Sequence, residues 1–241
     1  IDAVKTQSLY AFTLRNNPIN LDLWKYLWNA SGGGADSPDS SLSFTYSYLL
    51  DGTEYYQHIR GCRPTSGTLS VSRGMWEQTM TFVAKDITIP NTTDGNGGTP
   101  VYQSTETSSS PIVHSDGGAD PFTYNSVAYG ERSFSTTVTR NMAVMAVNGE
   151  TDITYTKATD RSITFTADVF AGTTSSETAL YTLYESKDAD AASYKFNSTG
   201  PITLTYANCV LTDYSYTHAA GSTDALIESI TARAESVTDL S

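Results

Sequence analysis

The chain has 241 residues, 39% of them hydrophobic, and its 14 Lys and Arg against 26 Asp and Glu give a formal net charge of −12. The apolar content is ample for a core, and no apolar run approaches the roughly 18 residues of a membrane-spanning helix. The basic residues are scattered along the chain, which excludes the basic stripe that tight nucleic-acid binding needs. Two explanations of the acidity stay open: plain solubility, or adaptation to high salt, where screening suppresses repulsion between carboxylates.

The chain opens with a predicted strand over residues 3–14, which the Asn-Asn-Pro sequence at 16–18 ends. A short helix is predicted over 20–29, with Asn20 as its cap and a glycine-rich stretch after it. Its buried face is formed by apolar residues at helical spacing, namely Leu23, Trp24, Leu27 and Trp28. Because the tryptophans share this face with leucines, core packing is favoured over stacking on a sugar or a base.

A hairpin follows the first helix. Apolar and hydroxyl residues alternate over 42–48, which is typical of a half-buried strand. Asp51-Gly52 is a turn signal, and the chain returns over 55–59. Two more strands are expected before the composition changes, at 68–72 and 77–88. Residues 91–121 then lose all periodicity and are rich in Gly, Ser, Thr and Pro, which indicates a linker or a functional loop.

The second part of the chain predicts a similar series of elements. Its helix begins at the capping-box sequence of residues 174–177 and buries Leu180, Leu183 and Tyr184. The strands expected before this helix are 134–140, 142–147, 151–156 and 162–170, with a turn at Asn148-Gly149. Those expected after it are 194–196, 202–209, 213–218 and 226–237.

Two stretches of the chain, 55–88 and 202–238, repeat one pattern. Each has an alternating run that ends in a small residue and a cysteine, then a second strand, a glycine, and a last strand with an alanine beside a basic residue. The matching pairs are Gly61-Cys62 with Asn208-Cys209, and Ala84-Lys85 with Ala232-Arg233. Such a repeat predicts two copies of one supersecondary unit. We therefore expect a mainly β (α+β) chain of two tandem β-sandwich domains, each with one short amphipathic helix, at 1–90 and 122–241, joined by 91–121.

The two cysteines, Cys62 and Cys209, occupy equivalent places in the two copies. Equivalent residues of two domains usually lie farther apart than the roughly 7 Å between Cα atoms that a disulfide allows. Both are therefore predicted to be free thiols buried as small hydrophobic residues.

The sequence offers no constellation for catalysis. Its histidines are His58, His114 and His218, and no GxSxG, HExxH, phosphate-binding loop or dinucleotide motif is present. Although His58 precedes Cys62 by four residues, this spacing on a strand separates them by about 13 Å. Carboxylate pairs such as Asp188/Asp190 occur in predicted turns, where acidic residues are expected. We predict no catalytic, cofactor-binding or metal-binding residue and no cofactor.

A longer stretch of the second part carries a family resemblance. The sequence SFSTTVTRNMAVMAVNGETDITYTKATDRSITFTADVF, followed by a short helix and by ITLTYANCVLTDYS and ALIESITARAESVT, resembles tail tube proteins of long-tailed phages and archaeal viruses. The end of the first copy, GCRPTSGTLSVSRG with TMTFVAKDIT, resembles the same closing motif. The first copy has no counterpart of the hairpin at 134–155.

The resemblance implies a structural, non-enzymatic virion protein of the tail. It implies self-assembly into stacked rings of six tube domains, with DNA as a passing cargo and tape-measure and tail-end proteins as partners. With two copies per chain, three chains would fill such a ring and give threefold and approximate sixfold symmetry. Two alternatives stay open from the residues alone: a β-sandwich module that binds carbohydrate or a host surface, suggested by 16 tyrosines, and an unrecognised hydrolase.

Overall fold

In this computed structural model the described residues are 10–18, 21–27, 41–72, 74–87, 112–113, 120–145, 155–170, 177–196, 203–217 and 226–239. They form one short 3₁₀ helix, one α-helix and strands β1 to β13. The elements of the first half are β1 (Tyr10–Asn16), η1 (Asp22–Tyr26), β2 (Leu42–Leu50), β3 (Thr53–Ser72), β4 (Glu77–Ala84) and β5 (Asp86–Ile87). Those of the second half are β6 (Phe122–Tyr124), β7 (Val127–Tyr129), β8 (Glu131–Met145), β9 (Tyr155–Phe170), α1 (Glu177–Ser186), β10 (Asp190–Lys195), β11 (Thr203–Thr217), β12 (Ile227–Ala234) and β13 (Ser236–Asp239).

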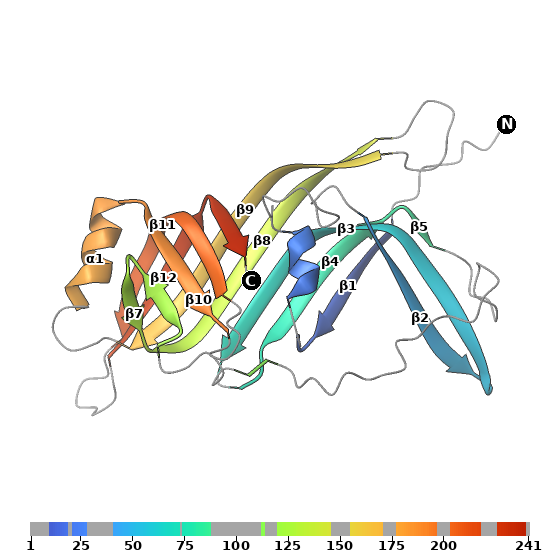
Figure 1. Ribbon diagram of the computed structural model, residues 1–241, viewed down its shortest axis with the longest axis horizontal. Coiled ribbons are helices and arrows are strands. Elements are labelled where there is room, and N and C mark those ends of the chain that lie inside the picture. The colour runs from blue at the N-terminus through green and yellow to red at the C-terminus, as the bar shows by residue number, and fades with distance from the viewer. Residues whose placement is uncertain are drawn as a thin grey trace.

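The strands of both halves pair into a single antiparallel sheet (Figure 1). Its central part has seven strands in the order β1-β4-β3-β8-β9-β12-β11, and the halves meet where β3 pairs with β8. At this junction the register runs from Ser66↔Thr139 to Ser72↔Ser133. The prediction of a mainly β fold is confirmed, and the sheet passes from one half to the other without interruption.

Two long strands, β3 and β11, each run through two layers of the fold. The first part of β3 pairs with β2 and β5, and its second part pairs with β4 and β8. The first part of β11 pairs with β10 and β13, and its second part pairs with β12. The change of direction coincides with a positive φ, 62° at Gly61 and 50° at Asn208. The sequence predicted two strands in place of each long strand, 55–59 and 68–72 for β3 and 202–209 and 213–218 for β11. This was wrong because each chain segment stays in the sheet throughout.

Hydrogen bonds beside these bends fix the correspondence between the halves. The Lys85 amide donates to the Arg60 carbonyl at 3.0 Å, and the Glu235 amide donates to the Ala207 carbonyl at 3.1 Å. Lys85 therefore corresponds to Glu235, so Ala84 corresponds to Ala234. The repeat seen in the sequence instead aligned Ala84-Lys85 with Ala232-Arg233, two residues too early. This was wrong because Ala232-Arg233 and Ala234-Glu235 are both an alanine followed by a charged residue, so the sequence alone does not distinguish them.

The two helices differ from each other. The first is a five-residue 3₁₀ helix whose N-cap position is Leu21, without a side-chain capping bond. It is shorter than the predicted helix over 20–29, but it buries Trp24 and Leu27 as expected. The second, α1, buries Leu180 fully and packs Leu183 and Tyr184 against the core. The predicted capping residues 174–176, Asn20 and Trp28 lie outside the described residues.

One aromatic core fills the space between the layers and joins both halves. Trp76 of the first half packs against Tyr194 and Phe196 of the second, with ring centroids 5.1 and 4.5 Å apart. The predicted linker contributes to this core, since Ile112 is buried and its backbone bonds to Pro18 and Trp76. The hairpin β6–β7, at the start of the second half, was not among the predicted strands. It adds Phe122, Tyr124 and Tyr129 to the core.

Candidate functional site: the uncovered face of the sheet

The seven-stranded sheet has one face against the core and one face that no described element covers. Helix η1 and strand β10 lie on the same side of the sheet in Figure 1. Along β4 the side chains of Gln78, Met80, Phe82 and Ala84 are buried, whereas those between them are partly or fully exposed. Strand β12 shows the same alternation. We call the face formed by the second set of side chains the uncovered face.

Hydroxyl side chains dominate the uncovered face. Because residues paired in the register lie side by side on the same face, the pairing defines rows that cross the sheet. The row nearest the middle runs from β12 to β1 as Arg233, Thr164, Thr137, Thr68, Thr79 and Arg15. The next row is Ser162, Thr139, Ser66, Thr81 and Thr13. On the other side lie Asp213, Thr231, Thr166, Ser135, Ser70 and Glu77. The rows pass through the β3–β8 junction unchanged.

Short polar contacts link neighbouring strands within these rows. The hydroxyl oxygens of Thr68 and Thr137 are 3.1 Å apart across the junction between the halves. The Ser133 and Ser229 hydroxyls both donate to Asp168, at 2.7 and 2.6 Å. The carboxylate is thus held by two neighbouring strands. Hydroxyl groups that bond to one another and to water give a polar surface without a fixed charge.

The charges of the uncovered face balance, although the whole chain carries −12. Its paired positions hold three arginines, Arg15, Arg63 and Arg233, and three acids, Glu77, Asp168 and Asp213. Arg15 and Glu77 form an exposed ion pair at 3.0 Å. The acidity of the chain therefore lies elsewhere, and a polyanion near this face meets mainly neutral hydroxyls.

The residues that the sequence singled out for possible chemistry do not come together. The His58 ring nitrogen Nδ1 lies 2.8 Å from the Thr45 hydroxyl on the hairpin β2–β3, and His114 and His218 lie outside the described residues. Cys62 and Cys209 are buried free thiols, as predicted. Burial raises their pKa values, to about 11 for Cys62 and about 12 for Cys209, so neither is a thiolate nucleophile at neutral pH.

A hollow opens on the uncovered face at the β3–β8 junction. It is lined by Ser70, Val71, Met75, Glu77, Ser133, Phe134, Ser135 and Thr166. The single carboxylate of this lining, Glu77, is engaged by Arg15, and the lining contains no histidine. It therefore lacks the base and orienting group that a serine nucleophile needs. Among the described residues no group of three His, Cys, Asp or Glu is placed to hold a metal ion.

The buried polar groups belong to the core. The Tyr194 hydroxyl donates to Glu131 at 2.5 Å, and the Tyr214 hydroxyl donates to Glu228 at 2.6 Å. Burial, together with Glu131, raises the pKa of Tyr194. Several tyrosines are thus structural, and their number alone does not indicate a sugar-binding surface. In the part of the chain that is described, no helix is long and apolar enough to cross a membrane.

The signal for the uncovered face is present in the sequence. Over 133–139 and 162–167, a hydroxyl residue stands at every second position on strands that pair with each other. The apolar positions alone predicted these strands, and the hydroxyl positions between them were given no role.

The family model described as phage tail tube protein matches residues 10–234. Among solved structures, Hcp1 from Flavobacterium johnsoniae is similar, with 15% identity, coverage of 49% of this chain and 91% of Hcp1, and a TM-score of 0.32. No curated protein matches the chain. Since the family model covers nearly all of the described residues, the chain belongs to the phage tail tube protein family, and its place is the tail of the virion.

Proposed function

We propose that the chain assembles with copies of itself into stacked rings, and that the uncovered faces line a hollow tube through which viral DNA passes. The observation that carries this proposal is the β3–β8 junction. There one half of the chain continues the sheet of the other, and the hydroxyl rows continue with it. The same kind of junction between chains would extend the sheet and its hydroxyl face around a ring.

The free edges of the sheet suit such a junction. The second part of β11 corresponds to the part of β3 that pairs with β8. Among the described strands, this part of β11 pairs only with β12, and β1 pairs only with β4. An unpaired edge strand is a template for another chain. In the assembly, the β11 edge of one chain faces the β1 edge of the next.

The number of chains per ring follows from the internal repeat. The corresponding bends at Gly61 and Asn208 and the matched hydrogen bonds of Lys85 and Glu235 support two copies of one tube domain in each chain. Three chains then supply six domains, with true threefold and approximate sixfold symmetry. The copies are unequal, since the first half contributes three central strands and the second contributes four. The tape-measure and tail-end proteins are the proposed partners of the finished tube.

A neutral hydroxyl lining fits the passage of DNA. Uniformly basic walls would hold the phosphate backbone by releasing counterions, and uniformly acidic walls would oppose its entry. Serine and threonine hydroxyls exchange hydrogen bonds with water and do neither. The acidity elsewhere on the chain suits either plain solubility or adaptation to high salt. Comparing the stability of the tubes in molar and in dilute salt distinguishes these two explanations.

Electron microscopy and native mass spectrometry of the purified chain test the proposal. Stacked rings with three chains each are expected. Rings of six chains would overturn the stoichiometry, and monodisperse monomers at all concentrations would overturn the assembly itself.

Proline variants of the β11 edge sharpen this test. Adjacent strand residues direct their N–H groups to opposite edges, so one of Ser215→Pro and Tyr216→Pro removes a donor from the free edge and the other removes one from the β12 pairing. One variant should stay folded by circular dichroism yet fail to form rings. If both variants form rings, the β11 edge is not the contact.

A further inference from the structure

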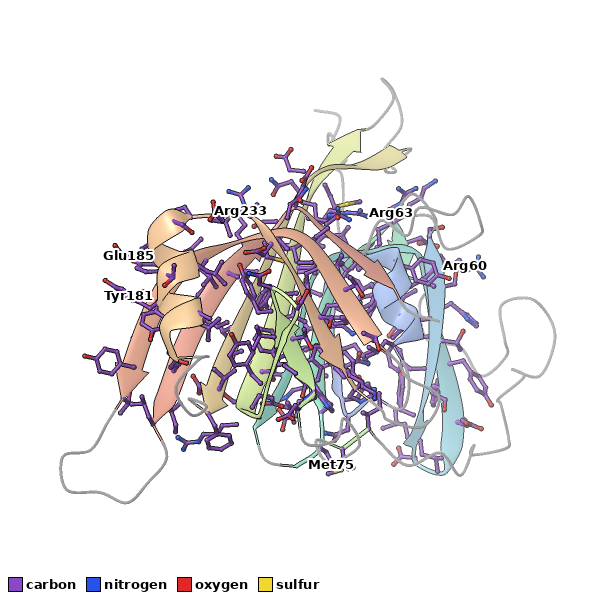
Figure 2. All side chains as sticks on the ribbon, turned by 60° about the vertical axis from the view of Figure 1, so that its left-hand side comes forward. Arg60, Arg63, Met75, Tyr181, Glu185 and Arg233 are labelled. Carbon is purple, nitrogen blue, oxygen red and sulfur yellow. The ribbon has the colours of Figure 1, made fainter. Side chains whose placement is uncertain are left out.

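Four tyrosines form an exposed cluster beside the free edge of β11. The Tyr214 ring contacts those of Tyr181 and Tyr184 on α1, with centroids 5.7 and 6.0 Å away. Tyr216 lies two residues further along β11 and points to the same face as Tyr214, because side chains alternate along a strand. Tyr181 is 50% exposed and Tyr216 is 67% exposed, and Figure 2 shows Tyr181 on α1 at the periphery of the molecule. We call these four residues the tyrosine cluster.

The strand position of Tyr216 is buried in the first half of the chain. Tyr216 pairs with Glu228 of β12, and the corresponding pair is Leu69 of β3 with Gln78 of β4. Leu69 is fully buried, and β8 lies beside it, where Leu69 pairs with Thr136. Among the described strands this part of β11 pairs only with β12. The same position is therefore covered at the junction inside the chain and exposed at the edge of the sheet.

The β1 edge shows the same difference. Strand β1 pairs with β4 as β9 pairs with β12, and the register makes Phe12 correspond to Phe165. Phe165 is buried beneath the sheet, as are its neighbours on the core face of β9. On β1, in contrast, Phe12 and Leu14 are only half-buried and Tyr10 is 37% exposed. Both free edges thus present apolar side chains on the core face of the sheet.

The internal junction indicates how the two edges would lie relative to each other in a ring. Across this junction Leu69 pairs with Thr136, and Thr136 pairs with Phe165, so the three side chains form one row. Tyr216 corresponds to the first member of this row and Phe12 to the last. In a ring with approximate sixfold symmetry, the same step leads from one chain to the next. It would place Tyr216 in the row of Phe12 of the neighbouring copy.

We propose that the tyrosine cluster is a docking surface for a second copy of the chain, and that Tyr10, Phe12 and Leu14 of that copy cover it. This inference rests on the proposed function and adds a side-chain contact to the pairing of strand edges. Tyrosine suits such a surface because its rigid ring buries a large apolar area at a low cost in conformational entropy. The β1 side is already ordered, since Phe12 stacks on Phe82 with centroids 5.1 Å apart. The aromatic core of each chain then continues into the next chain around the ring.

Ring formation by the full-length chain, followed over a range of concentrations by sedimentation velocity, tests this docking surface. Tyr216→Thr removes the aromatic side chain and keeps a β-branched residue suited to a strand. We expect the concentration at half assembly to rise at least about tenfold, as for an aromatic residue at the centre of an interface. The matched control is Tyr46→Thr, because Tyr46 is 47% exposed but lies on β2, outside the seven-stranded sheet. The control should assemble within about threefold of the unmodified chain.

Two further measurements examine the partner side of the contact. Tyr10→Thr should also weaken assembly, and the double variant with Tyr216→Thr should lose less than the product of the two separate effects, because both substitutions remove one contact. In the unmodified chain, nitration by tetranitromethane, mapped by mass spectrometry, should modify Tyr216 in dispersed chains and spare it in rings. Circular dichroism of each variant verifies that the dispersed chain stays folded.

The outcomes separate the docking surface from the assembly itself. Rings in which Tyr216 is nitrated as in dispersed chains would overturn the docking surface and place the tyrosine cluster on the outside of the tube. Equal assembly by Tyr216→Thr, or an equal loss in Tyr46→Thr, would also overturn it. Fully multiplicative losses for Tyr10→Thr and Tyr216→Thr would contradict the assignment of the β1 edge as the partner. Failure of the unmodified chain to form rings would instead contradict the proposed assembly, and the docking surface with it.

Discussion

The two halves of the sheet support their helices differently at corresponding positions of the long strands. Gly67 pairs with Met80 in the first half, and Tyr214 pairs with Ile230 in the second. A Cβ atom at Gly67 would lie 2.5 Å from a Leu27 methyl group and 3.0 Å from the Trp24 ring, so the missing side chain lets η1 pack directly on β3. Tyr214 instead fills this space, and the Tyr181 and Tyr184 rings of α1 pack on it, 5.7 and 6.0 Å away.

The buried polar residue beneath each helix differs in the same way. Gln78 accepts a hydrogen bond from the Trp24 indole at 2.8 Å, and the corresponding Glu228 accepts one from the Tyr214 hydroxyl at 2.6 Å. The same arrangement of strands is thus covered in two different ways on its core face. In the first half a small helix inserts a tryptophan, and in the second half a tyrosine of the sheet reaches outward. The difference lets the chain vary its outer layer while the hydroxyl face stays continuous.

Of the substitutions that test this difference between the two helices, Trp24→Ala should have the largest effect on stability. The Trp24 side chain is fully buried, and its loss removes the anchor of η1 and the donor to Gln78. We expect the free energy of unfolding of the dispersed chain to fall by about 3–5 kcal/mol in a urea titration. Tyr181→Ala, in the corresponding layer of the second half, should cost much less because Tyr181 is 50% exposed. Equal losses would show that the two helices are anchored alike.

A smaller effect is expected from Gly67→Ala. The added methyl group must displace Leu27 or Trp24, and overpacking of this kind costs about 1–3 kcal/mol. Because the nearest atom belongs to Leu27, the same change should cost less in a Leu27→Ala background, which a double-mutant cycle measures by urea unfolding. Ser66→Ala, the neighbouring change on the uncovered face, serves as the control and should stay within about 0.5 kcal/mol. Additive losses for Gly67 and Leu27 would argue against this contact.

The buried thiols of the two halves, Cys62 and Cys209, can be compared through the pH dependence of the free energy of unfolding. Burial raises the pKa of Cys62 to about 11 and that of Cys209 to about 12, from an ordinary value of 9.0. A raised pKa in the folded state favours the neutral thiol, so its contribution to stability is complete below pH 9 and is lost as the pH rises toward the folded value. Between pH 9 and 10 the free energy of unfolding should fall, with a slope that approaches about 1.4 kcal/mol per pH unit for each thiol. Cys62→Ala and Cys209→Ala should each reduce the slope, and an unchanged slope in either variant would show that its thiol ionises freely.

Much of the fold was predictable because strands and repeats leave local patterns. Apolar alternation identified most strands, and the repeat aligned Gly61-Cys62 with Asn208-Cys209, where the two bends lie. What the patterns could not give was the continuity of the sheet, since pairing such as β3 with β8 joins residues about seventy positions apart. The hydroxyl face was missed for a related reason. Each serine or threonine is unremarkable on its own strand, and rows emerge only when the register places Thr68 beside Thr137 and Thr79. The short form of η1 and the burial of Ile112 depend on tertiary contacts, which no local window contains.

The smallest effects are expected at the two bends, where the halves use different residues for one backbone conformation. Gly61 has a φ of 62° and Asn208 a φ of 50°, in the left-handed region that glycine and asparagine tolerate. Asn208→Gly keeps this conformation and loses only an exposed bond from the Asn208 amide to Glu235. Its cost in urea unfolding should therefore be below about 0.5 kcal/mol, whereas Asn208→Ala should cost about 1 kcal/mol because the left-handed backbone is unfavourable for alanine.

The reverse exchange, Gly61→Asn, is not equivalent, since its Cβ atom would lie 2.8 Å from the Cβ atom of Lys85. We expect it to cost about 1 kcal/mol despite the favourable backbone preference of asparagine. Equal effects for Gly61→Asn and Asn208→Gly would show that the bends are interchangeable, and a large loss for Asn208→Gly would show that the Glu235 bond, rather than the backbone, holds the second bend.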